Sequence, residues 1–516
     1  MEFDYVIVGA GSAGATLAAR LSEDPSTTVL LLEDGPDFRS ADVPKALQSL
    51  NPFAVIGQPG FTQYQFPDLM ARMSERQAPR LYWRGRGMGG SSAINGMIAI
   101  RGMLEDFDIW AEEGCEGWSG REVLPSFNKL EDDADFGDQP YHGKGGPIPV
   151  FRKPQEEWGS VDKALRDAAV DQGYGWADDH NSPGSTGVSP FAINGRHGIR
   201  VSTNDAYLEP ARGRPNLTIR GGVQVDTIVF QGQRAVGVSA LTAEGPTQFN
   251  GRQILICAGT IHSPTILLRS GVGPADELAA LGIAVRRDLP VGRNFIDHSS
   301  VWLSLLLKPE ARAQHRDARH TNCCVRYSSH LAGAAENDMF MASLNLLGYD
   351  EVGMSKGLVT TATFQTFSRG WLKLVSADPK VQPDISIRML SDERDLVRLR
   401  EGIRRTWRLL QHPAFTSIVD NVEALLTGDI LTALPQSDDA LDDWLFQVCS
   451  DTQHPVGTCR MGALGDPRTV VDSNCQVVGL EGLRVIDASV MPEMVRANTH
   501  LSTVMIAEHM AARLRA

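Results

Sequence analysis

The sequence predicts an α/β protein, α+β overall, that joins a Rossmann-like dinucleotide-binding domain with a discontinuous β-sheet to a substrate domain of β-sheet plus helices. Three observations support this fold class. An apolar run near the N-terminus leads through a glycine turn into a helical stretch, a second apolar run ends at a carboxylate, and the chain becomes β-rich between about residues 300 and 450. Strand, glycine turn and helix in that order are what a dinucleotide-binding unit requires.

The first unit is a predicted β-α-β. Val6 to Val8 is apolar, the glycine turn covers residues 9–14, and residues 15–21 have helical composition. Val29 to Leu32 ends at Glu33, at about the separation expected for a carboxylate that binds a ribose. The glycines permit a tight turn, a close approach to pyrophosphate and close packing of helix on strand. The plainer interpretations are a purely structural turn for the glycines and a solvated carboxylate for Glu33. We instead expect dinucleotide contacts from Gly9, Gly11, Ser12, Ala13, Gly14 and Glu33.

The rest of the chain predicts a lid, a small antiparallel element and a second domain. Residues 35–80 are rich in Pro, Gly and Gln and predict a lid-like insertion. Turn residues separate β-prone runs that predict an antiparallel element feeding a buried strand, at residues 217–219, 223–230, 235–241 and 253–256. The β-rich segments 301–307 and 371–375 precede a charged helical run, Asp392 to Leu410. The expected division is a cofactor-binding domain over 1–300 with insertions at about 35–80 and 150–195, a substrate-binding domain over 301–450, and a return to the first domain over 451–516.

Composition excludes several classes of protein. A net charge of -14 opposes nucleic-acid binding, which needs clustered Lys and Arg. No stretch approaches the roughly 18 to 20 apolar residues of a membrane span, and the N-terminus shows no secretory pattern, so a cytoplasmic protein is expected. The seven cysteines are scattered without a C-x-x-C pair and predict neither a disulfide framework nor a metal site.

Four further segments resemble the glucose-methanol-choline (GMC) oxidoreductase family, and with the first unit they extend from residue 5 to the C-terminus. They are residues 85–96 (GRGMGGSSAING), 259–273, 291–298 (VGRNFIDH) and the region from residue 453. A run of Gly and Ser lets backbone N–H groups approach a pyrophosphate. The resemblance implies FAD as the cofactor, with contacts from Gly87, Gly89, Gly90, Ser91, Asn95, Gly96, Val225, Ala258, Gly259, Asp487, Ala488, Thr499, His500 and Leu501.

Two positions depart from patterns found in the family. Ile94 stands where some members carry a histidine bonded covalently to the flavin, so non-covalent FAD is expected. Asp34 replaces the small residue that commonly follows the ribose-binding glutamate. Residues 132–150 and 370–400 look more like the aryl-alcohol and hydroxymethylfurfural oxidase branch than like glucose oxidases, and choline dehydrogenase-like members are also similar.

The resemblance also implies a catalytic pair of histidines. Oxidation of an alcohol through flavin needs a base with a pKa near neutrality, which selects histidine. His454, in the segment QHPVGTCRMG, matches the family's base, and His500, in RANTHLST, matches a position filled by His or Asn. We assign His454 as the base and His500 as the group that orients the substrate oxygen, with the reverse assignment left open. His298 is a weaker candidate with a structural role beside the site, and a helix over 503–514 is expected to point its N-terminus at the flavin.

The expected function is oxidation of a primary alcohol, on an aromatic or allylic carbon, to the aldehyde. The base abstracts the hydroxyl proton while hydride passes to flavin N5, and the electrons continue to oxygen or another acceptor. The expected partners are therefore a small alcohol and an electron acceptor, with no nucleic acid. Alternatives that keep the fold and FAD are a hydroxynitrile lyase-like enzyme, a fatty-acid photodecarboxylase-like enzyme and an FAD-binding protein without turnover.

Overall fold

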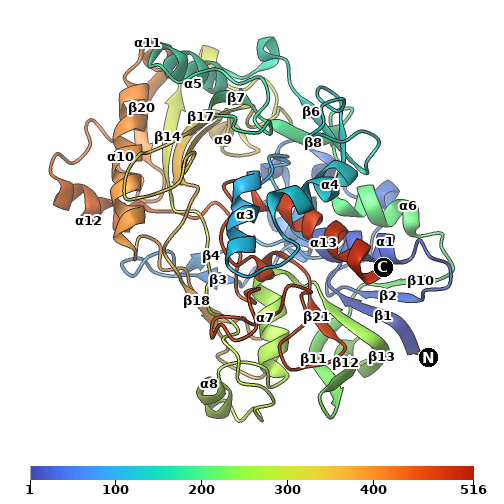
Figure 1. Ribbon diagram of the computed structural model, residues 1–516. Helices are drawn as coiled ribbons and strands as arrows, with labels where there is room; N and C mark the ends of the chain where they lie inside the picture. The colour runs from blue at the N-terminus through green and yellow to red at the C-terminus, as the bar shows by residue number, and fades with distance from the viewer. Residues whose placement is uncertain (1, 516) are drawn as a thin grey trace.

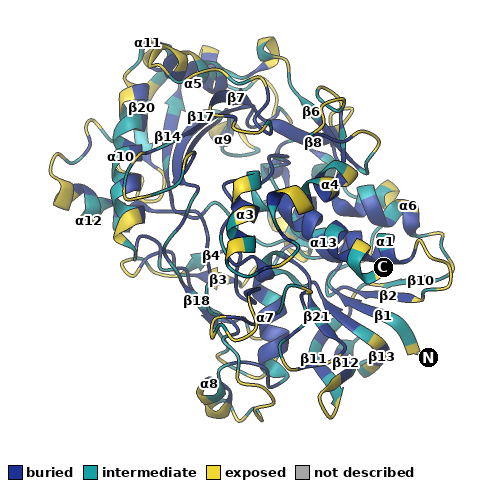
Figure 2. Ribbon diagram, viewed as in Figure 1, coloured by how far each residue is buried: buried dark blue, intermediate teal, exposed yellow. Residues whose placement is uncertain are grey.

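A seven-stranded sheet forms the centre of the first domain in the computed structural model, which describes residues 2–515 (Figure 1). Five of its strands run parallel: β10 (Leu217–Arg220), β2 (Val29–Leu32), β1 (Glu2–Val8), β13 (Gly245–Ile256) and β21 (Leu483–Val485). Antiparallel β12 (Arg234–Thr242) and β11 (Gln224–Gln231) complete the sheet. The central strands are apolar, and helices bury them, as in other parallel sheets (Figure 2). The predicted α/β class is confirmed.

One predicted strand pairing is wrong. Residues 217–219 were expected within the antiparallel element, but β10 pairs parallel with β2 and extends the other edge of the sheet. β13 is also longer than the predicted 253–256: its first half pairs antiparallel with β12, and its second half lies between β1 and β21. Alternating hydrophobicity identifies a strand but not its partner, which here lies almost two hundred residues away along the chain.

Helices from distant parts of the chain cover this sheet. The helix after the glycine turn, α1 (Ser12–Leu21), packs against the C-terminal helix α13 (Thr499–Arg515), which in turn packs on α4 (Gly120–Leu130). The helix predicted over 503–514 therefore begins four residues earlier, at Thr499. The other helices of this part are α2 (Lys45–Gln48), α3 (Leu104–Glu112), α6 (Glu209–Ala211), α7 (Gly259–Arg269) and α8 (Ala275–Ala280).

A second, six-stranded sheet has the order β20-β14-β17-β16-β15-β7. The strands are β20 (Val419–Ala424), β14 (Ser300–Leu307), β17 (Lys356–Thr363), β16 (Met339–Leu344), β15 (Cys323–Tyr327) and β7 (Gly187–Pro190). Its helices are α5 (Ser160–Asp171), α9 (Glu351–Met354), α10 (Glu393–Leu410), α11 (Pro413–Thr416) and α12 (Asp438–Val448). The predicted helix at 392–410 is confirmed by α10. Asp392 is its N-cap and accepts a hydrogen bond from the Arg394 N–H.

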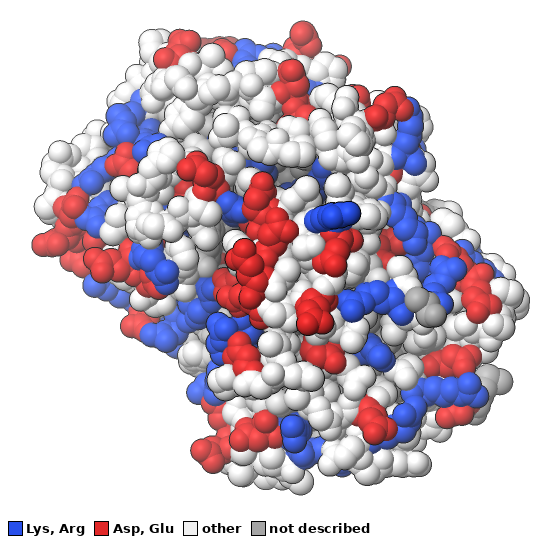
Figure 3. Space-filling model, in the orientation of Figure 1, with Lys and Arg blue, Asp and Glu red and all other residues white. Residues whose placement is uncertain are grey.

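Smaller sheets connect these units. β5 (Glu131–Asp133), β6 (Ile148–Arg152), β8 (Ala192–Arg196) and β9 (Ile199–Arg200) form one, and the pairs β3 (Met70–Ala71) with β4 (Arg80–Leu81) and β18 (Trp371–Lys373) with β19 (Asp384–Ser386) form two more. Within residues 2–515, none of the helices combines the length and apolar composition needed to cross a bilayer. Figure 3 shows acidic side chains gathered over α3 on one face.

Candidate active site

A cavity of about 690 Å³ is lined by residues of both large sheets. One end lies at the glycine turn between β1 and α1. The other end lies against β14, β16 and β17 of the six-stranded sheet. The cavity therefore brings together the predicted dinucleotide site and the predicted substrate domain.

Two glycine-rich segments meet at the first end. Gly9 has a φ of 98°, and a Cβ at Gly14 would lie 1.8 Å from the Gly9 carbonyl oxygen, so helix and turn pack too closely for a side chain there. A Cβ at Gly90 would lie 2.8 Å from the Cα of Gly11. This contact leaves a cradle of bare backbone in front of the N-terminus of α1, where the helix dipole favours an anion.

Glu33 links β2 to both glycine segments. Its Oε2 accepts the Ala10 N–H at 2.8 Å, and its Oε1 accepts the N–H groups of Gly35 and Gly87, each at 2.9 Å. Burial raises the pKa of Glu33, although the three N–H donors act in the opposite direction. The side chain lines the cavity, so it combines this structural role with the position expected of a ribose contact.

Most of the predicted cofactor contacts line the cavity. They are Gly9, Gly11, Ser12, Ala13, Glu33, Gly90, Ser91, Asn95, Gly96, Val225, Ala258, Gly259, Asp487, Ala488, Thr499 and His500. Four others pack behind it: Gly14, Gly87, Gly89 and Leu501. The backbone cradle and the carboxylate beside it fit FAD, whose pyrophosphate needs N–H donors and whose ribose needs an acceptor.

Asp487 supports the same end of the cavity from the opposite side. Its Oδ2 accepts the Gly259 N–H at 2.8 Å and the Ser263 hydroxyl at 2.5 Å, and its Oδ1 accepts the Ser489 N–H at 2.8 Å. Burial raises the pKa of Asp487. The carboxylate thus fixes the start of α7 beside the turn that carries Ala488.

His454 is the centre of a hydrogen-bonded group at the inner part of the cavity. Its Nε2 lies 2.9 Å from the amide nitrogen of Asn498, and its Nδ1 lies 2.8 Å from the Thr452 hydroxyl and 3.1 Å from Nδ1 of His298. Removal from bulk water lowers the pKa of His454 well below 6.5, with smaller contributions from His298 and Arg84. The ring is therefore neutral at pH 7 and able to accept a proton.

His500 lies in the first turn of α13 and lines the same cavity. Its Nδ1 is 3.1 Å from the Ser12 hydroxyl, and its buried Nε2 has no hydrogen-bond partner among residues 2–515. Burial lowers its pKa to about 4. In the described chain no hydrogen bond joins His454 to His500, and Asn498 is the residue that contacts His454 from this loop.

Sequence reasoning missed the groups that surround His454. Asp297 is buried and accepts hydrogen bonds from the His454 N–H at 3.1 Å and the Tyr82 hydroxyl at 2.5 Å. Burial, with the nearby charge of Asp451, raises the pKa of Asp297 to about 7. Asn498 precedes His500 by two residues and Asp297 directly precedes His298, so both lay inside motifs that had been noticed.

An apolar wall faces His454. The ring of Phe364 stacks on His298 with centroids 4.4 Å apart and on Phe340 with centroids 4.0 Å apart. The residues that line the cavity from the six-stranded sheet are all uncharged in the described structure: Trp302, Phe340, Ala342, Leu344, Thr360 and Ala362. This wall suits a neutral and flat molecule.

Comparison with known proteins gives a consistent result. The chain matches the family models of the GMC oxidoreductases, one over residues 3–300 and one over residues 366–507. It is 36% identical to 5-(hydroxymethyl)furfural oxidase of Methylovorus sp. (strain MP688), over 99% of this chain and 98% of the relative. It is 37% identical to an oxygen-dependent choline dehydrogenase of Escherichia coli O17:K52:H18, over 100% and 96%. Its fold resembles the crystal structure of pyridoxine 4-oxidase from Mesorbium loti, with a TM-score of 0.89, 30% identity and coverage of 100% and 99%.

Proposed function

Since this chain belongs to the GMC oxidoreductase family and is an FAD-dependent oxidoreductase acting on alcohols, we propose that it oxidises a neutral primary alcohol, on an aromatic or allylic carbon, to the aldehyde. The observation that carries the proposal is that His454, whose pKa burial lowers well below 6.5, lines the same cavity as the apolar wall and the glycine cradle. A base at that point can reach a hydroxyl while the aromatic body of the substrate lies against the wall.

His454 takes the hydroxyl proton in this mechanism at Nε2, where the substrate hydroxyl replaces the Asn498 amide that donates to this nitrogen in the structure. The unpartnered Nε2 of His500 is available to the substrate oxygen and holds it in orientation. FAD, when bound in the glycine cradle, supplies the acceptor for the hydride that leaves the carbinol carbon. The wall of Phe340 and Phe364 excludes water from the reacting atoms.

Choline is a second candidate, because the choline dehydrogenase is as similar to this chain as the furfural oxidase is. A quaternary ammonium group is held by a carboxylate or by an aromatic cage. Asp451 lines the cavity, but Arg80 already pairs with it at 3.0 Å. The lining from the six-stranded sheet contributes no carboxylate in the described structure, and Phe340 and Phe364 stack on each other. These features favour the neutral alcohol.

The test is anaerobic reduction of the flavin. The purified holoenzyme is mixed under argon with benzylic, furanic, aliphatic and choline substrates, and air is then admitted. We expect bleaching with benzylic or furanic alcohols, its loss in His454→Ala, and normal bleaching in the control His315→Ala, which changes an exposed histidine. The rate at which yellow returns in air distinguishes oxygen from another acceptor. A flavin that no alcohol bleaches would contradict the proposal and favour a lyase or a photodecarboxylase.

Two further properties belong to this proposal. Ile94 is buried beside the cavity and has no nucleophilic atom, which supports non-covalent FAD, so acid precipitation should release all flavin to the supernatant. All seven cysteines are free thiols and buried, which supports a reducing compartment such as the cytoplasm. Cell fractionation tests this location: alcohol oxidation activity found in the cell-envelope fraction would contradict it.

A further inference from the structure

His298 lies behind His454 and is completely buried. Its Nε2 is 3.1 Å from the carbonyl oxygen of Val495, and its Nδ1 is 3.1 Å from Nδ1 of His454. A carbonyl oxygen only accepts hydrogen bonds, so Nε2 of His298 carries a proton. Burial lowers the pKa of His298 to about 4, which leaves a neutral ring with a single N–H. The Nδ1 of His298 is therefore an acceptor without a proton.

This requirement decides the tautomer of His454. Two Nδ1 atoms 3.1 Å apart need one proton between them, and His298 has none to give. His454 therefore carries the proton on Nδ1, where it is shared between His298 and the Thr452 oxygen at 2.8 Å. The Thr452 hydroxyl remains free to donate to Oδ1 of Asp297 at 3.2 Å.

The other side of the His454 ring agrees with this assignment. Because the neutral ring has one proton, Nε2 of His454 is bare, and it faces the amide nitrogen of Asn498 at 2.9 Å, which donates. The opposite tautomer would place two lone pairs against each other at His298 and would require the Asn498 amide to turn so that its oxygen faces Nε2. The contact with His298 thus selects the tautomer, and the amide of Asn498 is oriented to match it.

We propose that His298 is a positioning residue that holds His454 as its Nδ1–H tautomer and so leaves on Nε2 the lone pair that takes the alcohol proton, once the substrate hydroxyl replaces the Asn498 amide at that nitrogen. The proposal rests on the proposed role of His454 as the base. Stacking on Phe364, with an interplanar angle of 18°, fixes the plane of the His298 ring. The charged or titratable groups around the pair are Asp297, Tyr82, Asp451, Arg80 and Arg84.

Two substitutions separate the two hydrogen bonds of His298. In His298→Asn, Oδ1 replaces the Nδ1 acceptor and the donor to Val495 is lost. In His298→Gln, the amide replaces the donor to Val495 and the acceptor is lost. General-base catalysis contributes about 10²–10⁴-fold, so we expect His298→Gln to lower kcat about 100-fold with the KM for the alcohol within about twofold, and His298→Asn to retain kcat within about fivefold. A purely structural role would make the two variants equally impaired.

A second readout does not depend on turnover. In holoenzyme labelled with ¹⁵N-histidine, the ring signals of His454 are identified by their absence in His454→Ala. We expect a protonated Nδ1 and an unprotonated Nε2 in the wild type and in His298→Asn, and a mixture of tautomers in His298→Gln. A protonated Nε2 in the wild type would overturn the proposal, as would wild-type kcat in His298→Gln. If instead His454→Ala still bleaches with alcohol, the base assignment fails, whatever the tautomer.

Discussion

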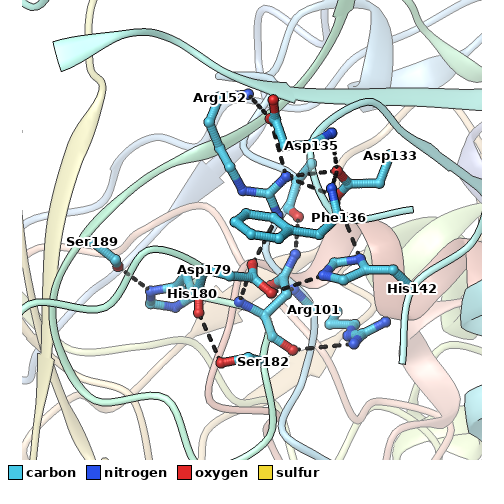
Figure 4. A network of polar contacts seen from close by, with 12 residues as sticks. Arg101, Asp133, Asp135, Phe136, His142, Arg152, Asp179, His180, Ser182 and Ser189 are labelled. Carbon is cyan, nitrogen blue, oxygen red and sulfur yellow. Dashed lines mark hydrogen bonds and ion pairs between the residues drawn. The ribbon is translucent and has the colours of Figure 1, made fainter. Parts of the chain in front are cut away.

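A network of charged side chains joins β5, β6 and the segment before β7, and we expect the stability of the protein to depend on its residue His142 (Figure 4). Arg152 bonds Asp133 and Asp179, each at 2.8 Å, while His142 places Nδ1 2.7 Å from Glu131 and Nε2 2.9 Å from Asp179. Both nitrogens of His142 face carboxylates, so both carry protons. A cationic His142 gives three cations, with Arg101 and Arg152, against the buried carboxylates of Glu131, Asp133 and Asp179. Asp135, which approaches Arg152 at 3.4 Å, is partly exposed to solvent.

The sign of the pH effect follows from this balance. Burial alone would lower the pKa of His142, but hydrogen bonds to Asp179 and Glu131 outweigh it and the pKa is raised above 6.5. The folded state therefore keeps the proton to a higher pH than the unfolded state. The stabilisation is fully present below about pH 6.5 and is lost as the pH rises through the folded pKa.

The perturbation is His142→Gln, which removes the charge. Breaking a buried ion pair by removing one partner costs about 3–5 kcal/mol. At about 2.1 cal/mol/K per residue, the 516 residues unfold with an entropy of about 1.1 kcal/mol/K, so the melting temperature should fall by about 3–5 °C at pH 6. Scanning calorimetry of the holoenzyme at pH 6 and pH 9 measures the deficit, with His315→Gln as the exposed control. A deficit of equal size at both values of pH would refute the reasoning.

Three other predictions concern the site and its support. Gly90→Ala places a Cβ 2.8 Å from the Cα of Gly11 at a φ of 50°, so the two glycine segments cannot keep their close contact. We expect the purified variant to contain at least about tenfold less flavin, measured as the ratio of flavin absorbance to protein absorbance. A wild-type ratio would contradict the role of the cradle in FAD binding. Because burial lowers the pKa of His454 well below 6.5, kcat/KM should be level from pH 7 to 8.5 and fall only in acid, whereas a rise through pH 7 to 8 would show that another group is the base. Asp106→Ala leaves Arg496 buried without its carboxylate partner, which lies at 2.6 Å in the wild type. The free energy of unfolding, measured by chemical denaturation, should fall by about 3–5 kcal/mol. An unchanged denaturation midpoint would contradict this prediction.

Local elements were predictable from the sequence because their signals are local. The unit β1-α1-β2 follows from apolar runs around a glycine turn, and α10 follows from its periodicity and its Asp392 cap. The parallel pairing of β10 with β2 was not predictable in the same way, since an apolar tetrapeptide after a long excursion of the chain is compatible with several edges. Its partner is fixed by the packing of the whole sheet.

The proposed catalytic group was predictable only in part, for a related reason. His454 was recognised from its motif, but its contacts come from three separate segments: Asp297 and His298 just before β14, Thr452 after α12, and Asn498 just before α13. An isolated β-bridge between Ile296 and Val456 brings the first two segments together. Spacing along the chain does not contain that contact.

The substrate wall was the least predictable part, and the reason lies in strand geometry. Phe340, Ala342 and Leu344 of β16 face the cavity, while Met339 faces the opposite side, against α10. All these positions are apolar, so the sequence does not reveal which alternate set points inward, and a shift of one residue would exchange the two sets. His454, the proposed base, and the residues that contact it lie outside this strand. Substitutions in the wall can therefore change the shape of the cavity without replacing a residue that contacts His454.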